Sequence, residues 1–188
     1  MNMWQKWTKY LHRYVPLNPN RQNDDWTKLI DLLNFNHDLD DESRQVLLQD
    51  HDDIQHNRAA FAQKLLDEGI WLEDDLAHLD EYHADELYCH ALRLALPCYH
   101  DDWKFDAEQL SKFISLQIHQ PFQIDFAECG NDMGVVCRKL EACSAFTLLD
   151  IASGGDDYGI IVVPKTHQQP ILEYAEKLGI FILSFNEL

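Results

Sequence analysis

The pattern of apolar residues changes near residue 144, and this change constrains the fold more than any other feature of the chain. Before it, apolar residues recur at helical spacing, as over 110–118. After it, two short apolar runs at 145–151 and 158–163 flank a Gly-Gly turn, which predicts a β-hairpin. A helical stripe and a last apolar run lead to Phe185. We therefore predict an α+β fold, with about six helices packed on a small C-terminal sheet of helix–strand–strand–helix–strand order.

The domain organisation follows from the same pattern. Residues 1–23 are expected to form an aromatic and basic helix followed by a linker rich in Pro and Asn. Residues 24–188 are expected to form a single α+β domain, mainly helical over 24–130 and mixed over 131–188. Helix ends are predicted at residues that cap or stop helices, namely Gly69, Asp106 and Gly179.

The negative charge of the chain is unevenly distributed. The net charge is −18, and residues 36–108 hold 20 Asp and Glu residues against 5 Lys and Arg residues. Such a surface repels nucleic acids and anionic membranes and attracts cationic proteins, so we expect a basic protein partner. The candidate contact residues are Asp50, Asp52, Asp53, Glu73, Asp74, Asp75, Asp101 and Asp102.

The cysteines and the start of the chain predict a cytoplasmic location. The five cysteines are an odd set without a CxxC pair, which favours reduced thiols. The first residues lack the continuous apolar stretch of a secretory signal, and no apolar run is long enough to span a bilayer.

The C-terminal motifs resemble a known family. The segments 148–151, 154–158 and 162–164, with Leu178-Gly179-Ile180, are similar to the bacterial family DUF6630. Gly69-Ile70 and Asp102-Trp103 match its earlier part, so that the resemblance covers about 60–185. It implies a helical region leading into a hairpin, a helix and a last strand. It implies no activity and no catalytic residues.

One helical face carries potential metal ligands. His83, Glu86 and His90 are spaced i, i+3, i+7, and imidazole with carboxylate could hold a divalent metal as the cofactor. The alternative is a polar edge of a bundle helix. The acidic clusters do not fit a calcium loop, because they lack its alternating ligands and central glycine.

The predicted hairpin turn is the other candidate site. Asp150, Asp156, Asp157 and Tyr158 are expected to gather near it, and paired carboxylates can perform acid–base chemistry when burial separates their pKa values. No nucleophile accompanies them, so the alternative is a turn-forming role for Asp156 and a core role for Tyr158. We assign no catalytic residue.

The N-terminal stretch combines aromatic and basic side chains. Trp4, Trp7 and Leu11 share one helical face, interleaved with Lys6, Lys9 and Arg13. Because the bulk of the chain is acidic, we expect this face to pack on the helical bundle or on a second copy, forming a homodimer, rather than on a membrane or nucleic acid.

The sequence favours an acidic cytoplasmic interaction module over an enzyme. A specific form is an immunity or inhibitor protein that neutralises a cationic toxin or nuclease. The alternatives are a metal-dependent enzyme using the His83 face and a housekeeping domain.

Overall fold

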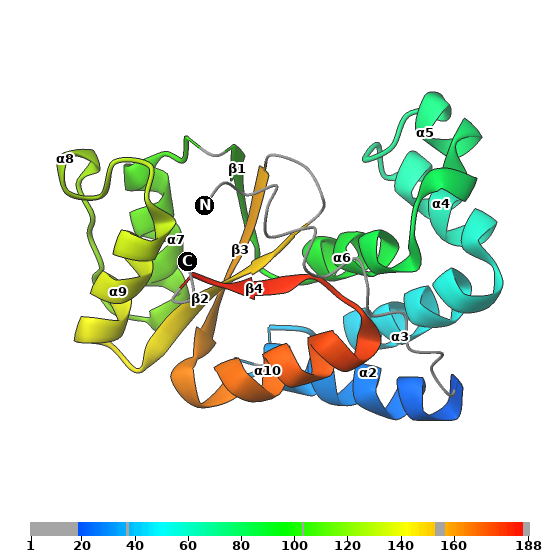
Figure 1. Cartoon of the computed structure of the whole chain (residues 1–188), viewed down its shortest axis with the longest axis horizontal. Coiled ribbons are helices and arrows are strands. Elements are labelled where there is room, and N and C mark those ends of the chain that lie inside the picture. Colours follow the sequence, from blue (N-terminus) through cyan, green and yellow to red (C-terminus); the bar gives the residue numbers. More distant parts are fainter. Residues whose placement is uncertain (1–18, 37, 103, 153–156, 186–188) are drawn as a thin grey trace.

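The computed structural model describes residues 19–36, 38–102, 104–152 and 157–185, with side chains from Asp24 onward. Within these ranges the chain forms helices, one 3₁₀ turn and strands, coloured along the sequence in Figure 1. Their bounds, in chain order, are α2 Pro19–Leu33, α3 Asp41–His56, α4 Arg58–Asp67, α5 Glu73–Ala77, η1 Leu79–Glu81, α6 Ala84–Ala95, β1 Tyr99–Asp102, α7 Ala107–Ile118, α8 Phe126–Cys129, α9 Met133–Cys143, β2 Phe146–Ile151, β3 Asp157–Pro164, α10 Lys165–Leu178 and β4 Ile182–Ser184.

The four described strands form one antiparallel sheet in the order β1-β3-β2-β4. The hairpin of β2 and β3 is central, and its register pairs Leu148 with Val162 and Asp150 with Ile160. The two edge strands are short: β1 pairs four residues with β3, and β4 pairs three residues with β2. The predicted α+β fold and its C-terminal order of elements are confirmed.

One face of the sheet packs on the larger group of helices. Leu149 and Ile151 of β2 and Ile161 and Val163 of β3 belong to a core shared with α2, α3, α4, α6 and α10. These helices occupy one side of the sheet in Figure 1. Alternate residues of a strand point to opposite faces, so this core takes the odd-numbered positions of β2 and β3.

The other face of the sheet is covered as well. Leu148, Ile160 and Val162 belong to a second core with Leu110 and Ile114 of α7, and with residues of α9. Both faces of the hairpin are therefore removed from water, which explains why its strands read as continuous apolar runs. We predicted a bundle on the sheet, and the structure adds this second helical layer.

Two elements differ from the sequence-based expectation. β1 is a strand within the region predicted to be mainly helical. The sequence did not predict it, because Tyr-His-Asp-Asp lacks the alternation of apolar and polar residues that is typical of a strand. Helix α2 begins at Pro19, inside the predicted linker of residues 1–23. Proline is well tolerated at the first helical position, where its missing N–H has no partner to lose.

The predicted helix boundaries are confirmed where capping chemistry is strong. Asp106 accepts hydrogen bonds from the backbone N–H groups of Glu108 and Gln109 and starts α7. Gly69 and Gly179 follow α4 and α10 with φ of 72° and 73°, a backbone conformation that residues with a Cβ rarely adopt.

The described helices include none with the length and apolar character needed to cross a bilayer. All five cysteines are free thiols, as expected.

A buried histidine lies in the helical core. His51 of α3 is 3% exposed and stacks on the rings of Trp26 and Tyr88, with centroid distances of 5.3 Å to each. Its Nε2 has no hydrogen-bond partner. Burial lowers the pKa of His51 from 6.5 to about 4, because a charged imidazole would be poorly solvated there.

This histidine predicts a loss of stability in acid. The folded state holds His51 in its neutral form, so the contribution of this residue to stability is fully present above pH 6.5. It is lost as the pH falls toward 4, because the unfolded state takes up a proton at a higher pH than the folded state. His51→Phe keeps the stacking and removes the titration. Urea unfolding at pH 7.5 and 4.5 should show the wild type losing about 2–3 kcal/mol more than this variant between the two pH values. Equal losses in both proteins would contradict the assignment.

Candidate functional site

The end of the molecule formed by residues 67–86 is strongly acidic, and we call it the acidic lobe. It comprises the end of α4, α5, η1 and the start of α6, at the far end of Figure 1 from α8 and α9. It contains nine carboxylates, and the sequence has no Lys or Arg between Lys64 and Arg93. The lobe therefore concentrates negative charge at one end of the molecule.

Two apolar side chains are exposed on the acidic lobe. After Gly69 turns the chain at the end of α4, the N–H groups of Ile70 and Trp71 both donate to Leu65 O. Trp71 then points inward, 4% exposed, and packs on Tyr82 with a centroid distance of 4.5 Å. Its neighbours point outward, so that Ile70 is 40% and Leu72 71% exposed.

Some of the lobe's carboxylates serve local structure. Asp75 accepts hydrogen bonds from Leu72 N at 2.8 Å and from the Tyr82 hydroxyl at 3.2 Å. Glu86 accepts from His83 N at 2.9 Å, at the start of α6. Glu73 and Asp74 are exposed, and among the described residues no carboxylate of the lobe forms an ion pair with lysine or arginine. His78 Nδ1 lies 2.9 Å from Glu81 Oε1, so within the described residues the pairing partner of a lobe carboxylate is a histidine and not a lysine or arginine.

The other candidate contact residues lie elsewhere. The prediction that Asp50 contacts a partner is wrong, because this residue is only 3% exposed. Both of its carboxylate oxygens accept hydrogen bonds from Lys64 Nζ at 2.7 Å. Asp52 and Asp53 belong to α3. Asp101 and Asp102 belong to β1, which Figure 1 shows apart from α5. Of the eight residues, Glu73, Asp74 and Asp75 lie on the acidic lobe.

The proposed metal face is not assembled. His83 precedes α6, where its backbone N–H occupies the Glu86 carboxylate. His90 contacts Trp71 edge-on at 6.1 Å, and burial, with Arg93 as the next cause, lowers its pKa. No group of three or more His, Cys, Asp or Glu side chains in the described part of the chain is arranged to hold a metal ion.

The hairpin residues gather around an arginine that the sequence analysis missed. Arg93 of α6 is 8% exposed, and its Nη2 donates to Asp157 Oδ2 at 2.6 Å. Asp150 is 7% exposed, and its Oδ1 accepts from Gly159 N at 2.9 Å. Asp156 lies outside the described residues. A signal for Arg93 existed, because it is the single Lys or Arg of residues 65–103 and lies in the apolar half of its helix.

Gly159 allows this arginine to approach the strand. A Cβ on Gly159 would lie 2.4 Å from Arg93 Nε and 2.8 Å from Ile151 O. The guanidinium therefore rests directly on the backbone of β3, and this contact joins α6 to the hairpin near its turn. Arg93 Nε itself has no hydrogen-bond partner.

The two remaining hairpin residues differ in their surroundings. Tyr158 packs edge-on against Phe185 at 5.9 Å, which is the predicted core role, and burial raises its pKa. Burial also raises the pKa of Asp150 to about 6, against opposing effects of the Gly159 hydrogen bond and of Arg93. The cluster can hold or release a proton near neutral pH, but its contacts close the hairpin and attach it to α6. We therefore read it as a structural clamp.

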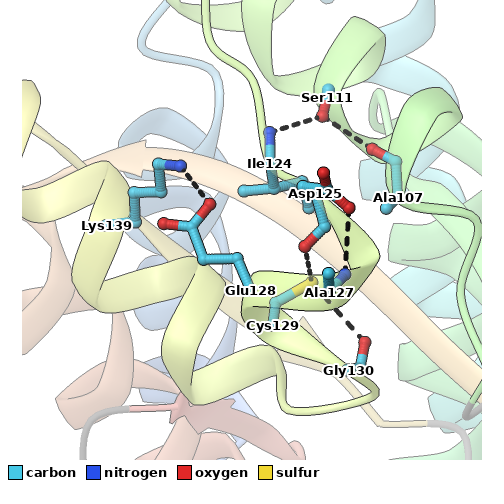
Figure 2. Close-up of polar contacts among 9 residues, drawn as sticks. All are labelled: Ala107, Ser111, Ile124, Asp125, Ala127, Glu128, Cys129, Gly130 and Lys139. Atoms are coloured by element: carbon cyan, nitrogen blue, oxygen red, sulfur yellow. Dashed lines mark hydrogen bonds and ion pairs between the residues drawn. The ribbon is translucent and has the colours of Figure 1, made fainter.

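An open groove of about 930 Å³ runs along α7, between the helix and residues 119–126. Figure 2 shows that Ser111 donates to Ala107 O and accepts from Ile124 N, while Asp125 accepts from Ala127 N. Lys139 pairs with Glu128 in the same view. These polar groups bind one another and hold the segment against α7 and α9. Leu116 and Phe126 remain exposed at the groove.

The raised pKa of Asp150 predicts a stabilising substitution. Above pH 6 the folded state holds an ionised carboxylate in a buried site, and stability is recovered as the pH falls through 6 toward 3.8. Asp150→Asn keeps the acceptor for Gly159 N–H and removes the charge. Thermal and urea unfolding should show this variant about 2–3 kcal/mol more stable than the wild type at pH 7.5, and equal to it near pH 4. A variant less stable at pH 7.5 would show that the charge itself stabilises the clamp.

The clamp also predicts a damaging substitution. Gly159→Ala places a methyl group against Arg93 and a backbone carbonyl that cannot move aside. The free energy of unfolding should fall by roughly 2–3 kcal/mol, measured by urea denaturation. A change within about 0.5 kcal/mol would mean that the arginine does not rest on this strand.

Comparison with known proteins places the chain in a family. The family model described as "Domain of unknown function (DUF6630)" matches residues 25–185, so the match begins 35 residues before the expected start of the resemblance at residue 60. An uncharacterised protein of Pasteurella multocida (strain Pm70) is 31% identical over 126 residues, which are 67% of this chain and 33% of that protein. The chain therefore spans about a third of this relative's length. No solved structure matches. The chain belongs to the DUF6630 family.

Proposed function

We propose that this protein is an acidic interaction module that binds a basic protein partner through the acidic lobe. The observation that supports this most is the set of nine carboxylates in residues 67–86, which pair with no lysine or arginine among the described residues and lie in the same lobe as two exposed apolar side chains. Nucleic acids and anionic membranes would be repelled by this surface, so the partner is a cationic protein.

The two kinds of side chain contribute differently to such binding. Exposed carboxylates raise the association rate of a cationic partner, and this effect falls with salt because the Debye length shrinks from about 10 Å at 0.1 M to about 3 Å at 1 M. Ile70 and Leu72 supply exposed apolar area on the same lobe, and its burial slows dissociation. A partner that fits has basic side chains around an apolar contact.

A specific form of this function is an immunity or inhibitor protein that neutralises a cationic toxin or nuclease in the cytoplasm. The clustered charge supports this form. A toxin gene directly upstream of the gene for this protein is the expected genomic arrangement.

The binding surface can be tested by charge reversal with a matched control. Immobilised wild-type protein should retain a basic protein from a lysate of the encoding organism at about 50 mM salt and release it at about 500 mM. Glu73→Lys/Asp74→Lys should abolish retention. Asp38→Lys/Glu173→Lys, with the same change in net charge at exposed positions between α2 and α3 and on α10, should preserve it.

Two outcomes would overturn the proposal. The first is that the wild type retains no cationic protein at low salt. The second is that both charge variants lose the retained protein equally, since this would assign binding to net charge and not to the acidic lobe.

A further inference from the structure

The chain carries its own segment with the chemistry that the acidic lobe would bind. Residues 1–18 precede α2 and lie outside the described residues. They contain three basic residues, Lys6, Lys9 and Arg13, and no Asp or Glu. Trp4, Trp7 and Leu11 recur in the same stretch. The segment is thus opposite to the lobe in charge and matches its exposed apolar pair.

The start of α2 is placed near the lobe. Helices α2 and α3 run antiparallel, because Trp26 Nε1 donates to Leu47 O while Asp31 pairs with Arg44. The start of α2 therefore lies along the end of α3, where the chain enters α4. Figure 1 shows the start of α2 and the lobe at the same end of the molecule.

The contacts of α4 extend this path to the lobe. Arg58, the first residue of α4, donates from Nη1 to Tyr82 O at 3.4 Å. Helix α4 has ten residues, about 15 Å, and leads directly to Gly69 and Ile70. Eighteen residues can span up to about 60 Å when extended. The segment can therefore reach the lobe of its own molecule with length to spare.

We propose that residues 1–18 dock on the acidic lobe of the same chain and cover Ile70 and Leu72. In this arrangement the basic side chains face the carboxylates around Glu73 and Asp74, and the tryptophans contact the apolar pair. The inference rests on the proposed function in one respect, since the segment then competes with the external partner for a single surface. A basic partner binds by displacing it.

Tethering makes a weak contact sufficient. A short flexible connection gives an effective concentration in the millimolar range, so an intrinsic dissociation constant near 1 mM already leaves the lobe about half covered. The same arithmetic sets the cost to the partner, whose apparent affinity falls in proportion to the uncovered fraction.

The proposal can be tested in the full-length chain without any partner. The photo-reactive amino acid p-benzoylphenylalanine is placed at position 72, and irradiated protein is mapped by mass spectrometry. The control label replaces Leu116 on α7, which is as exposed as Leu72, at 70% against 71%, but outside the lobe. The label at position 72 should crosslink to residues 1–18, at least fivefold more than the label at position 116.

Two further measurements identify the interaction. Lys6→Glu/Lys9→Glu/Arg13→Glu in the labelled chain should lower the crosslink yield at least fivefold, and about 0.5 M salt should lower it as well. A mixture of ¹⁴N- and ¹⁵N-labelled protein should yield crosslinks within one isotope only, because the contact is within one chain.

The outcomes separate this inference from the proposed function. No crosslink from position 72 to residues 1–18, an equal yield from position 116, or crosslinks between isotopes would overturn it, the last by showing a dimer instead. A basic protein retained by the lobe without such crosslinks leaves the proposed function standing alone. Crosslinks without any retained basic protein leave the self-contact standing alone.

Discussion

Burial of the central hairpin on both faces is the constraint that the rest of this structure depends on. Each of β2 and β3 alternates between two helical cores, one with α2, α3, α4, α6 and α10 and one with α7 and α9. A hairpin covered on one face alone would expose Leu148, Ile160 and Val162 to water. At about 25 cal/mol per Å² of apolar surface, loss of either helical layer would cost several kcal/mol, comparable with the total stability of a domain.

The connection between α6 and the sheet uses charge as well as apolar packing. Arg93 extends from the apolar end of α6, crosses Gly159 and binds Asp157, while Asp150 closes the same end of the hairpin. The Arg93 side chain is buried, while that of Asp157 is about half exposed. Desolvation of the guanidinium offsets part of the attraction, so the pair specifies the arrangement more than it stabilises it. Asp150 is desolvated as well, and its burial raises the pKa of that carboxyl to about 6.

Local chemistry made part of this fold predictable. The caps at Asp106, Gly69 and Gly179 and the apolar hairpin runs act over a few residues, so the sequence alone located them. Contacts between residues far apart in the sequence could not be located in this way. The burial of Asp50 depends on Lys64, fourteen positions away, and the role of Arg93 depends on Asp157, sixty-four positions away. The composition of the sequence predicted an acidic region. It did not predict that Ile70 and Leu72 are exposed there, because this depends on the turn after Gly69, which directs Trp71 inward and its neighbours outward.

The short edge strands limit the way in which this molecule can associate. β1 pairs four residues and carries Asp101 and Asp102, while β4 pairs three. An incoming peptide that sought to lengthen the sheet would gain few main-chain hydrogen bonds at either margin, and at β1 it would meet carboxylates. Association by strand addition is thereby disfavoured within the described sheet. Specificity in any assembly containing this protein has to come from side chains displayed on helices and turns.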